Sequence, residues 1–274
     1  MEDTLNIAPF QITTHHNSAS LRSFLAGIAA SIAMVACSGG GSQPPTVDAT
    51  AHDDSTAPAP GAVAPILITE KTAVDSDDPA IWINPEDPAR SLVLGTDKGG
   101  SVFVFDLDGK IVPDKVVSGM GRMNNIDVAY GFALGGEKID IALATDRNEE
   151  KIRIFRLPDM VPVDNGGIPT FVGETDDRRA MGLAVYTRPS DGSIFAIVSR
   201  KFGASGSYLW QYLLEDAGDG TIKATKVRAF GEFVGGKEIE AVAVDNELGY
   251  VYYSDEMAGI HKYLADPDAP DANT

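Results

Sequence analysis

Short β-rich runs recur along the chain in groups, and this repetition constrains the fold more than any other feature. From Ile66 on, stretches of Val, Ile, Leu, Ala and aromatic residues are separated by Gly, Asp and Pro, which is typical of strands joined by turns. The runs lie at 80–83, 91–95 and 101–105; 126–130, 139–144 and 151–156; 182–186, 193–198 and 207–212; and 241–244, 250–253 and 259–263. Four units of three to four strands, spaced about 50 residues apart, predict an all-β chain made of β-propeller blades.

Residues at matching positions in these units are separated by nearly constant intervals. In the first three units, the residue that opens the first strand precedes the residue after the second strand by 20 positions, and in the fourth unit by 16. Neighbouring strands of a blade are antiparallel, so both positions should lie at the same end of the sheet. The pairs are Asp78 and Lys98, Asp127 and Arg147, Met181 and Lys201, and Glu240 and Glu256.

Because the first strand of each blade lines the central channel, we expect acids and bases from different blades to share one mouth of that channel. Acids there would hold a metal ion and bases would hold an anion, as a metal-bound ligand with several phosphates requires. The alternative is a set of solvated rim charges. The residues in question are Asp78, Asn124, Asn125, Asp127, Glu240 and Glu256, together with Lys98, Arg147 and Lys201.

The stretch 75–82 carries the densest group of acids. Asp75, Asp77 and Asp78 lie within four residues and directly precede Pro79. Such a cluster repels itself unless a cation neutralises it, and Ca²⁺, which takes about six to eight oxygen ligands, suits it. The alternative is a solvated turn capped by an Asp.

Composition excludes several classes of function. With 22 Lys and Arg against 40 Asp and Glu, the formal net charge is −18, which argues against nucleic acid as a partner. The single cysteine, Cys37, leaves no disulfide framework, zinc knuckle or thiol active site in the body of the chain. The four histidines have no metal-ligand spacing.

The N-terminal part predicts export. Residues 24–36 form an unbroken apolar run, too short for a bilayer span of about 20 residues but suited to the core of a secretory signal. Met34-Val35-Ala36-Cys37 is similar to a lipobox, so we expect residues 1–37 to be a signal peptide of lipoprotein type, with lipidation at Cys37. Residues 38–65, rich in Gly, Pro and Ala, would form a flexible linker, and 66–274 the propeller domain. The protein would then be an outer-membrane-anchored lipoprotein or a periplasmic or extracellular protein, touching the membrane only through the lipid.

Three motifs resemble those of the β-propeller phytases. They are Asp75-Ser76-Asp77-Asp78-Pro79-Ala80-Ile81-Trp82, Asn124-Asn125-Ile126-Asp127-Val128 and Asp146-Arg147-Asn148, and the resemblance runs from about residue 72 to 264. It implies a propeller of six four-stranded blades, monomeric when full length. It also implies calcium-dependent hydrolysis of phytate, bound as its calcium salt, by a calcium-bridged water, in a phosphoric monoester hydrolase of 3-phytase type.

The resemblance also implies roles for individual residues. The calcium ligands would be Asp78, Glu240 and Glu256, with Asp77 and Asp127 as further candidates. The phosphate-binding bases would be Lys98, Arg147 and Lys201, with Arg178 as a fourth. Lys98, Arg147, Lys201 and Glu240 would form the catalytic group.

Some positions depart from the pattern of the family. Met181 stands where a Tyr is common, and Phe202 follows Lys201 where an acid is frequent. About four of six blades are present, so we expect a C-terminally truncated gene product, and a non-catalytic propeller that acts as a binding module is the alternative function. Asp106 begins an Asp-x-Asp-Gly pattern similar to that of the aspartyl-phosphate hydrolases, but a hairpin turn explains it better.

Overall fold

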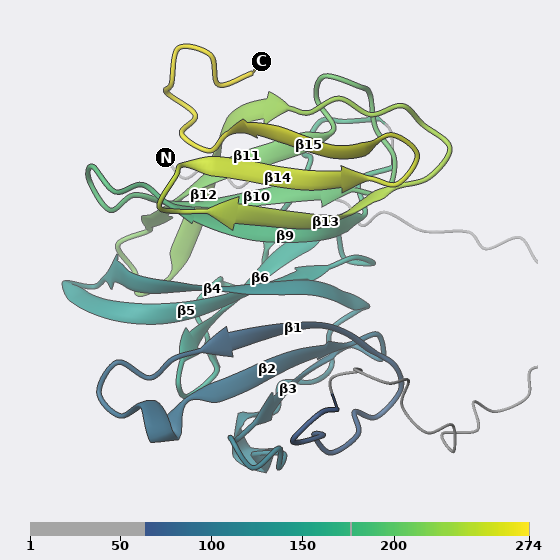
Figure 1. Ribbon diagram of the computed structural model, residues 1–274. Coiled ribbons are helices and arrows are strands. Elements are labelled where there is room, and N and C mark those ends of the chain that lie inside the picture. Colours follow the sequence, from purple (N-terminus) through teal and green to yellow (C-terminus); the bar gives the residue numbers. More distant parts are fainter. Residues whose placement is uncertain (1–63, 176, 274) are drawn as a thin grey trace, which may run out of the picture. The chain divides into compact units, whose positions relative to one another are not determined.

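Four antiparallel sheets follow one another along the chain in the computed structural model, which describes residues 64–175 and 177–273 (Figure 1). The predicted signal segment with Cys37, and residues 38–63 of the predicted linker, lie outside the described residues. The two short 3-10 turns in the described part are η1 (Pro88–Arg90) and η2 (Pro113–Lys115). Among the described residues, no helix has the length and apolar character needed to cross a membrane.

Each sheet is a meander of consecutive strands. The first holds β1 (Ser76–Trp82), β2 (Leu92–Asp97) and β3 (Ser101–Phe105); the second holds β4 (Met123–Leu134), β5 (Glu137–Asp146), β6 (Lys151–Leu157), β7 (Val161–Pro162) and β8 (Ile168–Pro169). The third holds β9 (Ala180–Thr187), β10 (Ile194–Arg200), β11 (Leu209–Asp216) and β12 (Ile222–Phe230), and the fourth holds β13 (Ile239–Asp245), β14 (Tyr250–Asp255) and β15 (Gly259–Leu264). These sheets confirm the predicted all-β propeller class.

The number of strands varies from blade to blade. The third sheet has four consecutive strands, whereas the first and fourth have three in the described chain. In the first sheet, an isolated bridge between Val102 and Val117 stands in place of a fourth strand. In the second, the outer edge is divided into β7 and β8, because a Gly-Gly turn at 166–167 separates two Pro-containing pieces.

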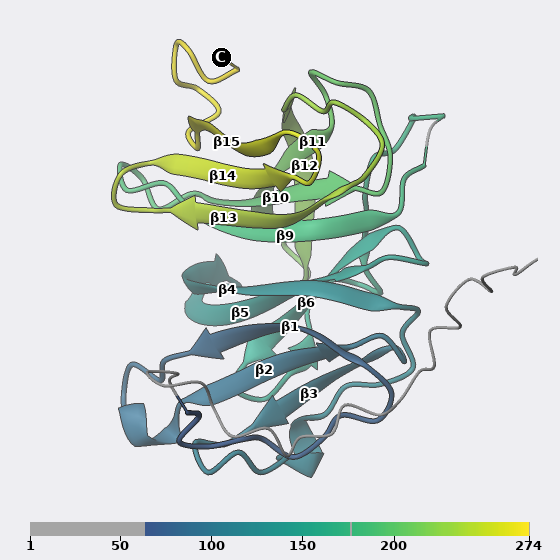
Figure 2. The same cartoon turned by 45° about the vertical axis from the view of Figure 1, so that its right-hand side comes forward.

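The first strands of the four sheets lie side by side. β1 contacts β4, β4 contacts β9, and β9 contacts β13, and both views show these strands one above another (Figure 2). The first and fourth sheets lie at opposite ends of this series, and no described strand of one pairs with a strand of the other. β1, β4, β9 and β13 are therefore the inner strands, as the sequence predicts.

The core consists of three apolar layers, one between each pair of neighbouring sheets. Trp82 and Leu94 pack with Met123 and Phe155 between the first and second sheets. A larger layer around Trp210 joins the second and third, and a layer around Tyr253 joins the third and fourth. Burying side chains on both faces of the middle sheets fixes the order and spacing of the blades.

Buried hydroxyl groups join neighbouring inner strands at one end. Thr145 Oγ1 accepts from the N–H of Asn125 (3.0 Å) and donates to the carbonyl oxygen of Met181 in the next sheet (2.7 Å). The same contact is made by Thr96, which accepts from Asp78 and donates to Asn124, and by Ser199, which accepts from Gly182 and donates to Ile239. The inner strands are thereby held in register at the end that carries the acidic residues.

Candidate metal and phosphate site

A cavity of about 290 Å³ opens at this end of the inner strands. It is lined by residues of three sheets: Asp77 and Asp78 from β1, Asn125 from β4, Glu240 and Ala241 from β13, and Ser254 and Glu256 from β14 and the residues after it. Positions separated by more than 160 residues thus meet in one place. The antiparallel register is responsible, because Ser76 pairs with Asp97 and Ile239 pairs with Asp255, which puts each strand start beside the end of its neighbour.

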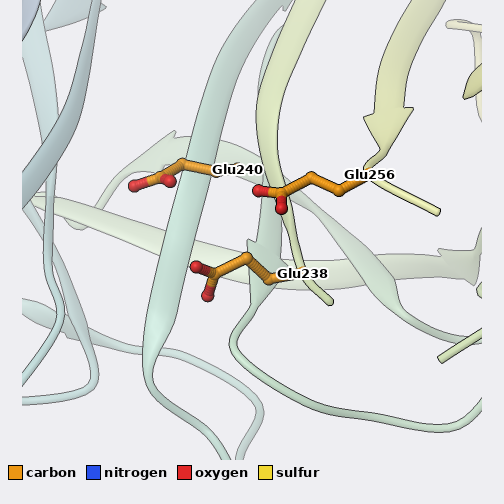
Figure 3. Close-up of side chains that lie close together, drawn as sticks. All are labelled: Glu238, Glu240 and Glu256. Carbon is orange, nitrogen blue, oxygen red and sulfur yellow. The ribbon is translucent and has the colours of Figure 1, made fainter. Parts of the chain in front are cut away.

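Three glutamates of the fourth sheet converge at this cavity (Figure 3). Glu238, Glu240 and Glu256 each place one carboxylate oxygen within 4.8 Å of the others. Glu238 forms an ion pair with Lys201, and Glu256 lies 3.6 Å from Lys237, whereas Glu240 accepts from the side-chain amide of Asn124 (2.7 Å). The negative charge of the group is therefore only partly compensated within the described chain.

Asp78 faces the same charges from the first sheet. Its Oδ2 accepts a hydrogen bond from the N–H of Ile126 (3.0 Å), which favours the ionised form. Burial nevertheless raises the pKa of the Asp78 carboxyl, and the neighbouring charges of Asp77 and Glu240 raise it further. A carboxylate in this position is stabilised by a cation.

Two buried oxygen atoms near the carboxylates have no hydrogen-bond partner within the described chain. They are Oδ2 of Asp77 and Oδ1 of Asn124. The Asn124 amide nitrogen already donates to Glu240, so its carbonyl oxygen is left as a free acceptor. Free carboxylate and amide oxygens beside a group of glutamates are the donor set of a hard cation such as Ca²⁺, so the residues present fit that ion.

The predicted bases occupy one repeated position, directly after the second strand of their sheets. The N–H of each donates to the carbonyl oxygen of a residue that precedes the inner strand. These bonds run from Lys98 to Asp75 (2.9 Å), from Arg147 to Arg122 (2.8 Å), from Lys201 to Arg179 (2.9 Å) and, in the fourth sheet, from Glu256 to Glu238 (3.3 Å). The structure therefore brings Lys98, Arg147, Lys201 and Glu256 to the same end of their sheets.

Each base has a different electrostatic environment. Lys98 Nζ lies 2.9 Å from Asp75 and 3.1 Å from Asp77, and hydrogen bonds to these carboxylates raise the pKa of Lys98. Lys201 forms an ion pair with Glu238, and its ammonium lies 5.8 Å from the ring centre of Phe202. Lys98 is therefore held by acids of the first sheet, and Lys201 is held by one of the three glutamates of the fourth sheet.

The two predicted arginines belong to the second and third sheets: Arg147 directly follows β5, and Arg178 precedes β9. Arg178 pairs with Glu150, which lies in the turn between β5 and β6. Arg147 is half-buried and has no ion pair with a described carboxylate, although its charge helps to lower the pKa of Asp177, which is lowered chiefly by hydrogen bonding to Arg179. The four predicted bases therefore lie on the first three sheets, and among them Lys201 contacts an acid of the fourth sheet.

A family model described as Phytase matches residues 23–274. The chain belongs to the phytase family. The match includes all of the described residues, and it confirms the resemblance carried by the three motifs.

A curated relative of this phytase-family chain is a 3-phytase of Bacillus subtilis (strain 168). The two are 33% identical over 195 residues, which is 70% of this chain and 48% of the relative. The chain thus spans about half the length of the relative that it matches.

Among solved structures, the computationally designed Ika4 protein is similar with a TM-score of 0.44 and 10% identity, covering 74% of this chain and 99% of that one. The designed Ika8 protein gives a TM-score of 0.42 at 10% identity, covering 73% and 48%. Neither likeness bears on function.

Asp127 is placed differently from the other predicted acids of this phytase-family chain. Its Oδ1 accepts from the N–H of Val128 and its Oδ2 from the N–H of Val185, both at 2.8 Å. It lines a separate cavity between the inner strands, together with Asp78, and burial raises its pKa. Its carboxylate thus joins β4 to β9 and lies outside the group of three glutamates.

Sequence reasoning missed Glu238, which forms part of the acidic group. Its position two residues before Glu240 was a usable signal, because alternate residues of an extended segment point to the same side.

Of the positions that depart from the family pattern, Met181 is fully buried and Phe202 is exposed. Asp106 lies in a turn, where its Oδ1 accepts from the N–H groups of Asp108 and Lys110, as expected for a hairpin.

Proposed function

We propose that this chain hydrolyses phosphate monoesters of phytate, presented as the calcium salt. The observation that carries the proposal is the cavity at the end of the inner strands, where carboxylates of the first and fourth sheets lie beside Lys98 and Lys201. Membership of the phytase family and the 3-phytase relative support the substrate class. A highly phosphorylated ring needs both kinds of charge, because the metal neutralises its phosphates and the bases orient them.

In this proposal, calcium is held by Asp78, Glu240 and Glu256, with Asp77 and Glu238 close by and Asp127 as a further candidate. When bound, Ca²⁺ would supply positive charge for the phosphoryl oxygens and would lower the pKa of a coordinated water. The chain's contribution is to keep several carboxylates ionised in one place, against the burial and the repulsion that raise the pKa of Asp78.

The bases would bind the phosphoryl group. Lys98, Arg147 and Lys201 would donate hydrogen bonds to its oxygens, and Arg178 would bind a further phosphate. Hydrolysis joins a water oxygen to phosphorus and breaks the phosphorus–oxygen bond to the inositol, whose oxygen takes a proton. Negative charge grows on the phosphoryl and leaving oxygens during this exchange, so positive groups fixed at this position accelerate it.

The test is phosphate release from phytate by the chain itself, with Ca²⁺ titrated into the assay and with EDTA as the metal-free control. Release that rises with calcium and stops with EDTA supports the proposal. The absence of release at every calcium concentration, from a protein shown to be folded, would contradict it.

A non-catalytic binding module is the second candidate. One observation favours it: the outer face of the fourth sheet leaves Ala241, Ala243 and Ile260 exposed. Binding of phytate without release of phosphate would support this candidate over the enzyme.

We propose export as well, with a lipid anchor on Cys37. The support is the apolar run at 24–36 and the Met34-Val35-Ala36-Cys37 pattern. Metabolic labelling with a radioactive fatty acid tests the anchor: the wild type should be labelled and Cys37→Ser should not. Equal labelling of both would rule out Cys37 as the attachment point.

A further inference from the structure

Each sheet carries a pair of residues joined by a backbone hydrogen bond at the site end. One member precedes the inner strand, and the other follows the second strand. The members are Asp75 and Lys98 in the first sheet, Arg122 and Arg147 in the second, Arg179 and Lys201 in the third, and Glu238 and Glu256 in the fourth. The equivalent bonding gives these pairs equivalent backbone positions in the four blades.

In the first and fourth sheets, the side chains at the two positions of a pair lie close together. In the first sheet, Lys98 Nζ lies 2.9 Å from the Asp75 carboxylate. In the fourth, carboxylate oxygens of Glu238 and Glu256 lie within 4.8 Å of each other. The backbone geometry of the pair therefore allows its two side chains to reach a common point.

In the second sheet, both members of the pair are arginines. Neither Arg122 nor Arg147 has an ion pair with any described carboxylate, and Nε of Arg122 is buried without a hydrogen-bond partner in the described chain. The third sheet also has two bases, but there Asp177 binds Arg179 and Glu238 binds Lys201. The charge of Arg147 helps to lower the pKa of Asp177, but both carboxylate oxygens of Asp177 already accept hydrogen bonds from Arg179.

The backbone bond between Arg147 and Arg122 starts both side chains from adjacent points. Two guanidinium groups at such positions repel each other unless an anion lies between them, and a buried N–H without a partner costs free energy. An anion with several oxygens removes both penalties. A phosphate monoester is well matched, because guanidinium binds phosphate through parallel hydrogen bonds.

We propose that Arg122 is a phosphate-binding residue of the site, acting with Arg147 on one phosphate monoester group of the ligand. The proposal deepens the proposed function and rests on it for the identity of the ligand. Arg122 would add a second fork of donors to a phosphate that Arg147 holds, so that the second sheet binds one phosphate while the acids of the first and fourth sheets hold metal. Ligands with several phosphates are favoured by this arrangement over ligands with one.

The test measures binding rather than turnover. Inorganic phosphate is titrated into the full chain in EDTA at low ionic strength, and the dissociation constant is measured by calorimetry for the wild type, Arg122→Gln and Arg90→Gln. Arg90 is a matched control, because it is an exposed arginine of the first sheet at the end of η1. Arg122→Gln should weaken binding by about tenfold, the loss expected for hydrogen bonds to a charged group, and Arg90→Gln should not.

Arg122→Lys guards against a folding defect in Arg122→Gln, because it keeps the charge but removes the fork of donors. It should melt at the wild-type temperature and bind phosphate more weakly than the wild type. The titration measures phosphate binding and requires no hydrolysis. A chain that releases no phosphate from phytate can therefore still show the predicted loss of phosphate affinity in the Arg122 variants. Wild-type affinity in folded Arg122→Gln or Arg122→Lys would overturn the proposal.

Discussion

The side-chain nitrogen of Asn124 lies 2.7 Å from Oε1 of Glu240, so one hydrogen bond joins the inner strands of the second and fourth sheets. This bond orients the glutamate toward the cavity and leaves Oδ1 of Asn124 without a partner in the described chain. The amide therefore positions one proposed metal ligand and offers its own carbonyl oxygen as another.

Replacing Asn124 by Ala should weaken calcium binding by about tenfold or more, because the supporting hydrogen bond and a free oxygen are lost together. Asn148→Ala is the control, because Asn148 is exposed in the turn after β5. Calorimetric titration with Ca²⁺ measures both variants. An unchanged affinity in folded Asn124→Ala would show that the amide does not support the metal site.

Lys98→Met should lower the rate of phosphate release at saturating phytate by about 100-fold, because a positive donor to the phosphoryl oxygens is lost. Calcium binding should be retained or strengthened, since Asp75 and Asp77 lose their ammonium partner. Lys110→Met is the control, because this exposed lysine of the first sheet pairs with Glu70. Equal rates for wild type and Lys98→Met would remove Lys98 from the proposed mechanism.

Acidification should stabilise the metal-free protein through Asp78. Its pKa is raised above 3.8, the ordinary value of an Asp carboxyl, chiefly by burial, so the folded state binds the proton more tightly than the unfolded state. The free energy of unfolding in EDTA should therefore gain a contribution as the pH falls through the folded pKa, and this contribution is complete below 3.8. Calcium affinity should fall over the same range, because the metal needs the ionised carboxylate.

Denaturant unfolding in EDTA, from neutral pH down to about pH 4, measures this contribution as the difference between wild type and Asp78→Asn. The variant should lack it. Burial, the main cause of the raised pKa of Asp127, acts in both proteins, and only the smaller contribution from the Asp78 charge is lost in the variant. Parallel stability curves for the two proteins would show that Asp78 titrates normally.

Thr145→Val should destabilise the fold by about 2 to 3 kcal/mol, because it leaves the buried N–H of Asn125 and the carbonyl of Met181 without their shared hydroxyl. The matched control is Thr225→Val, at an exposed position of β12, where a change within about 0.5 kcal/mol is expected. Urea unfolding of both variants gives the comparison. Similar losses for the two would mean that the repeated hydroxyl does not hold the blades together.

Much of the fold was accessible from sequence because the period of the apolar runs is a local property. Asp78, Glu240 and Glu256 could be placed at one end of the inner strands from antiparallel pairing alone, and the structure brings them to one cavity. The contact between Asn124 and Glu240 could not be predicted, because it spans 116 positions and depends on how the blades pack.

Differences between the repeats also limited the sequence analysis. The last residue of the second strand is Asp97, Asp146 or Asp255 in three sheets, where its carboxylate accepts backbone N–H groups of the segment before the inner strand. The third sheet has Arg200 instead, which is fully buried, pairs with Glu174 at 2.9 Å and lies over the ring of Phe171. Comparing the four repeats position by position would have revealed this exchange, but its partners lie in loops that carry no repeat.

The central claim is that the carboxylates at the end of the inner strands bind calcium. Calorimetric titration of the full chain with Ca²⁺ tests it most directly, with Glu240→Gln as the variant and Glu247→Gln, an exposed change in the turn between β13 and β14, as the control. The wild type and Glu247→Gln should bind alike, and Glu240→Gln should bind at least about tenfold more weakly, because one charged oxygen donor is lost. No calcium binding by the folded wild type, or equal binding by all three proteins, would contradict the claim.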